Sequence, residues 1–211
     1  MKIGTQEVIF IIEILGTIAF AASGAIVAVE KKMDILGVII LGITTAVGGG
    51  VIRDVILGIT PPATFRKPVY AIVAAVVSII VFIAPVRRWL HKRQLFEPLM
   101  MGLDALGLGV FTVVGISAAK GVTDTSGFLQ LFTGVVTGVG GGILRDMMAQ
   151  RMPYVFVKHF YASASIIGGI ICILVWKFLG EFHAIIIGTA VVFILRVLAA
   201  IFKWSLPKAT D

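Results

Sequence analysis

The chain has 211 residues, of which 59% are hydrophobic and 14% are charged, and its formal net charge is +7. Soluble domains carry about 25% charged residues, so this composition and the mean hydropathy of +1.08 exclude an ordinary soluble domain. The basic residues gather in short loops between apolar segments, which is typical of cytoplasmic membrane loops rather than of a nucleic-acid surface. The sequence therefore predicts an integral membrane protein.

Seven apolar segments follow one another along the chain, each close to the length of about 20 residues that crosses a bilayer as a helix. They predict an all-α membrane protein with seven transmembrane helices. The segments cover residues 8–29, 35–59, 69–86, 98–118, 126–149, 160–179 and 183–204.

The first three segments resemble the next three. Matching acid, Leu-Gly, Phe and Gly positions recur 91 residues later, and "GGGVIRD" recurs as "GGGILRD" 92 residues later. A repeat of three spans must enter the membrane from the opposite side in its second copy, which predicts an inverted repeat. We expect one membrane domain over 1–211, with repeat 1 at 7–90, inverted repeat 2 at 97–180 and a seventh helix at 183–204.

Each repeat carries a glycine triplet inside its second span. Three consecutive glycines weaken a helix interior, so the triplets predict kinked or unwound backbone near the middle of the membrane. The alternative is that the glycines only allow close packing of helices. Two such breaks facing each other are typical of a transport site. The carbonyls of Val47 and Val139 are candidate ligands for a monovalent cation, whereas freed amides would favour an anion. The triplets are Gly48, Gly49 and Gly50, and Gly140, Gly141 and Gly142.

Charged residues within the spans must face the bundle interior or water, because lipid exposure at a helix centre costs about 2.5–3.5 kcal/mol each. They are Glu13, Asp54, Asp104, Asp146, Arg53, Arg145 and Arg196. Arg53 and Asp54 are neighbours whose side chains leave a helix about 100° apart. We therefore predict pairing across the repeats, Arg53 with Asp146 and Arg145 with Asp54, or with Glu13 and Asp104. The alternative is that these ion pairs only stabilise the fold.

Lysine and arginine counts predict the orientation. Ten of these residues in the loops and tails fall on one side and five on the other. The positive-inside rule then predicts a cell-membrane protein with its N-terminus outside and its C-terminus in the cytoplasm.

Motifs of enzymes and cofactors do not emerge. The glycine-rich runs lack the downstream acid of a dinucleotide site and the lysine of a phosphate-binding loop, and the single cysteine, Cys172, has no metal-ligand spacing. We expect no enzyme activity and no cofactor.

The doubled "GGGxxRD" motif in a 3+3+1 arrangement of spans resembles the prokaryotic branch of the trimeric intracellular cation (TRIC) channel family. The resemblance implies a homotrimer in membrane lipid, with a pore in each protomer between helices kinked at the two triplets. It implies conduction of potassium and also sodium. The implied pathway residues, besides the glycines, are Thr45, Thr137, Arg53, Asp54, Arg145 and Asp146, while Lys67, Tyr70, Lys158 and Tyr161 match as pathway or gate positions.

Two other functions are consistent with the same sequence. Related bacterial sequences are described as glycine transporters, so a secondary transporter of a small amino acid is the alternative function. A membrane scaffold without transport is the third, and there a leucine at Gly49 or Gly141 would alter stability but not flux.

Overall fold

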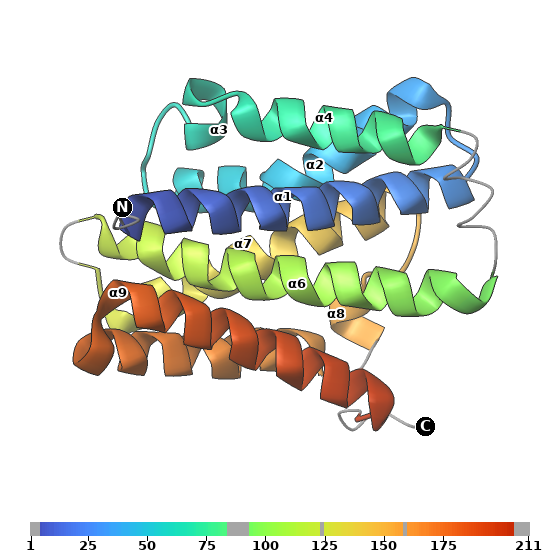
Figure 1. The fold of residues 1–211 in the computed structure, drawn as a ribbon. Helices are drawn as coiled ribbons and strands as arrows, with labels where there is room; N and C mark the ends of the chain where they lie inside the picture. The colour runs from blue at the N-terminus through green and yellow to red at the C-terminus, as the bar shows by residue number, and fades with distance from the viewer. Residues whose placement is uncertain (1–4, 84–92, 123–124, 158–159, 205–211) are drawn as a thin grey trace.

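The computed structural model describes residues 5–83, 93–122, 125–157 and 160–204, and in these residues the fold is all-helical, as predicted. The long helices lie side by side, and α1 begins at the end of the bundle opposite to the one where α9 ends (Figure 1). The helices are α1 (Thr5–Glu30), α2 (Ile35–Ile56), α3 (Ala63–Arg66), α4 (Val69–Phe82), α6 (Arg93–Lys120), α7 (Gly127–Met148), α8 (Tyr154–Val157) and α9 (Tyr161–Ile201).

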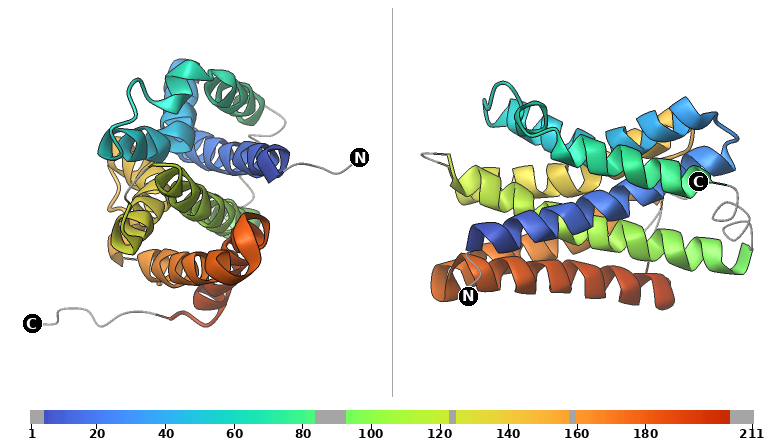
Figure 2. Two further views of the ribbon diagram at one scale, coloured as in Figure 1. Left: turned by 90° about the vertical axis from the view of Figure 1, so that its left-hand side faces the viewer. Right: turned by 45° about the horizontal axis from the view of Figure 1, so that its top comes forward.

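Helix α9 is interrupted at Gly180, whose φ of 77° and ψ of 180° are not helical. Glycine adopts a positive φ without the steric penalty of a side chain. The two arms, 161–179 and 181–201, therefore fold back along each other at one edge of the bundle (Figures 1 and 2). The break falls between the sixth and seventh apolar segments that the sequence indicates.

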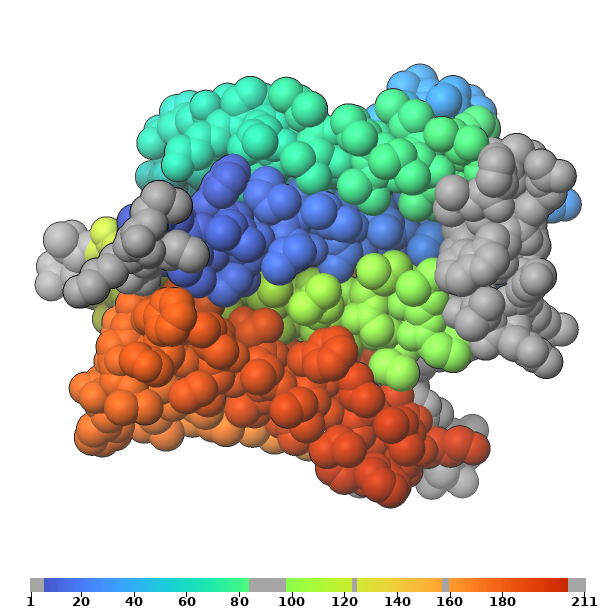
Figure 3. Space-filling view, in the orientation of Figure 1, coloured from blue at the N-terminus to red at the C-terminus, as the bar shows by residue number. Residues whose placement is uncertain are grey.

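Among the described residues, five helices are long and apolar enough to cross a membrane, and α4 is a shorter apolar helix. Large apolar side chains cover the outside, for example Phe178 and Phe128, which are 81% and 77% exposed. Figure 3 shows one outer face, formed by α1, α4, α6 and α9. An outside of this kind is stable in lipid rather than in water, so the chain is a multi-pass membrane protein.

The helices that carry the triplets begin in the same way. The carboxylate of Asp34 accepts a hydrogen bond from the amide of Gly37 at the start of α2. The hydroxyl of Ser126 accepts one from the amide of Leu129 at the start of α7. Both residues are side-chain caps for otherwise unpaired amides, and they stand 92 positions apart, as the two triplets do.

The predicted unwinding at the glycine triplets is wrong, because α2 and α7 are helical without interruption through both of them. The glycines instead let the two helices cross backbone to backbone. A Cβ at Gly49 would collide with the carbonyl oxygen of Thr137, and a Cβ at Gly141 with that of Thr45. A Cβ at Gly140 would lie 3.1 Å from the Cα of Gly49. Close approach of two membrane helices through small residues gives favourable packing that larger side chains prevent.

Replacing Gly141 by Ala is expected to destabilise the protein. The atom that the new methyl meets is a backbone carbonyl, which cannot rotate away, so the helices must separate. Overpacking of this kind costs about 1–3 kcal/mol. The expected result is a fall of several degrees in the melting temperature in detergent, at roughly 2–4 °C per kcal/mol for a chain of this size.

Gly102→Ala is the matched control, since Gly102 also lies inside a long helix but has no atom within 4 Å of the point that a Cβ would occupy. Its melting temperature should stay the same or rise slightly, because Ala favours a helix. Equal melting temperatures for the two variants would contradict the backbone contact.

Candidate functional site

Thr45 and Thr137 lie at the helix crossing and are almost completely buried. The Thr45 hydroxyl donates to the carbonyl oxygen of Leu41 at 2.6 Å, and the Thr137 hydroxyl donates to that of Thr133 at 2.5 Å. Each hydroxyl is thus engaged by the preceding turn of its own helix. The backbone carbonyls of these threonines are the atoms that face the glycines of the opposite helix.

The carbonyls of Val47 and Val139 lie within the same uninterrupted helices. A carbonyl in an α-helix accepts the amide four residues later. The helix therefore does not leave these oxygens open as a ready-made ligand set for a cation, as an unwound segment would.

In the first half, Arg53 pairs with its own neighbour. Its Nη2 lies 2.7 Å and its Nε 2.8 Å from Oδ1 of Asp54. The other oxygen of Asp54 accepts the amide of Ala63, the first residue of α3, at 2.7 Å. Asp54 thus ties the end of α2 to the start of the following short helix.

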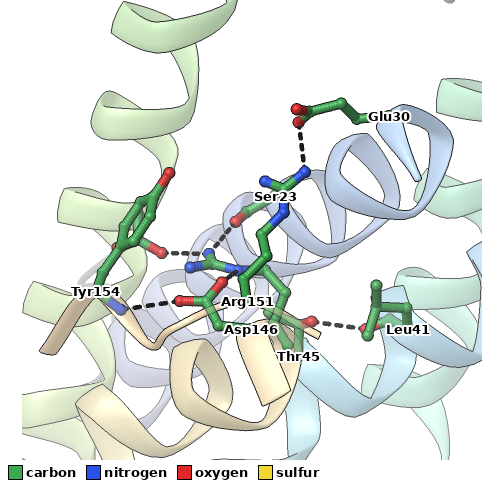
Figure 4. A network of polar contacts seen from close by, with 9 residues as sticks. Ser23, Glu30, Leu41, Thr45, Asp146, Arg151 and Tyr154 are labelled. Atoms are coloured by element: carbon green, nitrogen blue, oxygen red, sulfur yellow. Dashed lines mark hydrogen bonds and ion pairs between the residues drawn. The ribbon is translucent and has the colours of Figure 1, made fainter. Parts of the chain in front are cut away.

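The second half repeats this pattern and adds to it. Nε of Arg145 lies 2.8 Å from Oδ1 of Asp146, and Oδ2 of Asp146 accepts the amide of Tyr154 in α8 at 3.1 Å. Nη1 of Arg145 also donates to Oδ1 of Asp104 at 2.6 Å and to the hydroxyl of Ser23 at 2.5 Å. Figure 4 shows these contacts beside an outer ion pair between Arg151 and Glu30, at 2.8 Å.

The predicted pairs across the repeats, Arg53 with Asp146 and Arg145 with Asp54, are wrong. The long arginine side chain bends back far enough for its guanidinium group to reach the neighbouring carboxylate, although the two side chains leave the helix in different directions. The alternative pairing of Arg145 with Asp104 is formed. Two contacts of this network do cross between the halves, the hydrogen bond from Arg145 to Ser23 and the ion pair of Arg151 with Glu30, and both end on α1.

Each half also brings a tyrosine of its third helix toward an acid of its first. The hydroxyl of Tyr70 donates to Oε2 of Glu13. Tyr161 is 3% exposed and lies near Asp104, and the guanidinium of Arg196 lies 4.6 Å from the centre of its ring. The sequence singled out these residues by position but not their pairing. The signal was available, because both the acids and the tyrosines recur after 91 residues.

A polar cavity of about 330 Å³ opens in the first half, between α1, α2, α3, α4 and α6. Six of the predicted residues line it: Glu13, Val47, Gly50, Arg53, Lys67 and Tyr70. Gln6, Thr64, Arg66 and Phe111 also line it and were missed, because a single polar residue in a loop or an aromatic residue in a span carries no motif.

The equivalent residues of the second half are shut away from solvent. Asp104, Arg145 and Tyr161 are each 3% exposed or less, whereas Glu13, Arg53 and Tyr70 are partly exposed and Lys67 is exposed. Asp54 and Asp146 are equally buried, at 1%. Lys158 lies outside the described residues. The candidate site is therefore asymmetric, with an accessible first half and a closed second half.

In the part of the chain that the structure describes, no three His, Cys, Asp or Glu residues gather as a metal-ligand set.

Comparison with known proteins identifies relatives over almost the whole chain. The family model described as glycine transporter matches residues 10–85 and 101–177. The UPF0126 membrane protein YvgT of Bacillus subtilis is 38% identical over 202 residues, which cover 94% of this chain and 95% of YvgT.

Two solved structures share the fold. A TRIC cation channel whose structure addresses the basis of conductance has a TM-score of 0.83 and 36% sequence identity, covering 95% of this chain and 97% of that one. The TRIC trimeric intracellular cation channel orthologue from Rhodobacter sphaeroides has a TM-score of 0.85 and 31% identity, covering 93% and 99%. The chain therefore belongs to the prokaryotic branch of the TRIC channel family, which is the family that the glycine transporter model describes.

Proposed function

We propose that this protein is a channel for monovalent cations, potassium and also sodium. The observation that carries the proposal is the polar cavity inside an apolar bundle, lined by the charged groups of Glu13, Arg53 and Lys67. Charges at this depth are stable where they face water or partner groups and not lipid. The similarity to TRIC cation channels supports the same conclusion.

The proposed architecture is seven crossings, with inverted repeats at 7–90 and 97–180 and a seventh helix at 183–204. Helices α1 and α6 run in opposite directions (Figure 1), and the Arg-Asp pairs of the two halves each hold the start of a short helix. These features support the inverted arrangement. The basic loops support an orientation with the N-terminus outside the cell and the C-terminus in the cytoplasm.

The proposed pathway begins in the cavity and passes beside the crossing of α2 and α7. Gly50 lies on the cavity side of the crossing, and Gly49 faces the other helix. The pathway then enters the second half near Gly142, Arg145 and Asp146. Because Arg145 and Asp146 are fully buried here, we take this conformation to be closed.

A homotrimer in membrane lipid is the proposed assembly, in keeping with the trimeric channel from Rhodobacter sphaeroides. Each protomer would carry its own pore, since the helices of one chain are enough to surround the cavity. The proposed permeant species are the ions themselves, and no cofactor takes part.

A second function, transport of a small amino acid such as glycine, is favoured by one feature of the cavity. Glu13 offers a negative group, and Arg66 and Lys67 offer positive groups, in a space of about 330 Å³. The ammonium group of a zwitterionic amino acid would bind Glu13, and its carboxylate would bind Arg66 and Lys67. A carrier would bind the solute in this cavity and release it through the second half.

Recording from planar bilayers in a potassium gradient tests the two functions. A channel gives unitary currents whose reversal potential lies near that of potassium. A carrier gives saturable uptake and counterflow of labelled glycine in proteoliposomes without unitary events, and that result would overturn the channel.

Lys67→Gln is expected to raise the unitary potassium conductance at low ionic strength. A positive charge about 8 Å from a cation in water repels it by about 0.5 kcal/mol, which changes local cation concentration by a factor of about two. Salt at 1 M screens such a charge over about 3 Å, so the gain should disappear there. Lys67→Arg keeps the charge and serves as the control; a gain in that variant too would refute an electrostatic cause.

Arg145→Gln is expected to destabilise the protein strongly. It removes the partner of both Asp104 and Asp146, which are buried, and breaking a buried ion pair costs about 3–5 kcal/mol. The measurement is the melting temperature in detergent.

Arg151→Gln is the control, because its pair with Glu30 is partly exposed, and surface pairs contribute about 0–1 kcal/mol. If the two variants melted together, Arg145 would not be the anchor of the second half.

A further inference from the structure

The structure holds the same constellation of residues in two conformations, one in each half. Each half has an acid on its first helix, an Arg-Asp pair and a third glycine on its second, and a tyrosine at the start of its third. In the second half the acid and the tyrosine lie beside the arginine at the third glycine. In the first half the acid and the tyrosine are hydrogen-bonded to each other and lie away from that glycine. This comparison rests on the inverted arrangement proposed above.

The atoms that surround the third glycine of each triplet show this difference between the halves. A Cβ at Gly142 would lie 3.0 Å from the hydroxyl of Tyr161, 3.8 Å from Nη2 of Arg145 and 3.9 Å from Oδ1 of Asp104. A Cβ at Gly50 would also lie 3.8 Å from Nη2 of its arginine, Arg53, but no other atom outside its own helix backbone comes within 4 Å. The arginines are thus placed alike, while the acid and the tyrosine have moved away from the first one.

One position on the first helix of each half explains why only one arginine is held. Arg145 donates to the hydroxyl of Ser23, on α1, at 2.5 Å, and to Asp104 through the same nitrogen. The position equivalent to Ser23 is Val114 on α6, which lines the cavity with Arg53. Valine accepts no hydrogen bond, and among the described residues the hydrogen bonds of Arg53 reach Asp54 alone.

We propose that Ser23 and Val114 are positioning residues that set which half of the pathway is open. Ser23 fixes Arg145 on Asp104 and holds the second half closed. Val114 leaves Arg53 without this support, so Glu13 stays with Tyr70 and the cavity that these residues line with Arg53 stays open.

The first consequence is a difference in access between two equivalent positions. Val47 lines the cavity, and its counterpart Val139 is 8% exposed in the closed half. Cysteine at position 47 is therefore expected to react faster with a small cationic methanethiosulfonate than cysteine at position 139. The protein is tested in detergent, where the reagent reaches both ends, and the chain without new cysteines gives the background because Cys172 is buried.

The decisive experiment adds the missing hydroxyl to the first half. Val114→Ser and Val114→Ala remove the same two methyl groups, and only serine supplies an acceptor for Arg53. We expect the reaction of the cysteine at position 47 to be at least threefold slower with serine than with alanine. Any change shared by both variants reports the lost volume, so the comparison isolates the hydroxyl.

Equal rates for the serine and alanine variants, or equal rates at positions 47 and 139 in the otherwise unchanged chain, would overturn the proposal. The melting temperature of each variant shows that the folded protein is being compared. The rates of cysteine modification do not depend on ion flow, so this experiment is independent of the channel recordings. A difference in access without potassium currents would refute the proposed channel and leave the role of Ser23 and Val114 intact.

In the channel, Val114→Ser should also lower the fraction of time spent open at least threefold relative to Val114→Ala. An open fraction unaffected by the hydroxyl would contradict the role of this position in conduction.

Discussion

The close contact between α2 and α7 is the constraint on which the rest of the structure depends. Gly49 and Gly141 each face a backbone carbonyl of the other helix, so the helix axes are as near as their backbones allow. This crossing fixes where Arg53 and Arg145 stand, since each follows its triplet within two turns of helix. The Arg-Asp pairs then fix the short helices α3 and α8 through the amides of Ala63 and Tyr154.

A symmetric crossing does not give two equal halves, because the residues around the two arginines differ. Phe20 of α1 packs against Gly107 and Gly141, two glycines of the second repeat, and is 1% exposed. Its counterpart Phe111 lines the cavity of the first half instead. Arg196, on the arm of α9 that has no repeat partner, stacks on Tyr161. An added helix thus covers the second constellation from outside, where buried charges gain from additional partners.

The sequence predicted the helical class and the segment limits well, because apolar length and glycine or charged breaks are local signals. Of the charge pairs that it offered, only the alternative pairing of Arg145 with Asp104 is formed. It failed at the triplets, since helix propensity measured in water favours unwinding, whereas a lipid environment penalises every unpaired backbone group. The pairing of Arg53 with Asp54 was missed because residue spacing gives the direction in which a side chain leaves the helix. It does not give the position of the charged group at the end of a long arginine side chain.

The contrast between Ser23 and Val114 was present in the repeat alignment but carried no meaning there. A serine in one copy of a segment and a valine at the aligned position of the other copy is an ordinary difference, until the structure shows which helix each of them contacts. Once Arg145 is seen to cross from α7 to Ser23 on α1, the valine on α6 becomes a missing acceptor beside Arg53. In the proposed arrangement Arg53 keeps contact with the cavity, where water can accept the hydrogen bonds that Val114 cannot. This difference acts in the same direction as those at Phe20 and Arg196, toward an accessible first half and a closely packed second half.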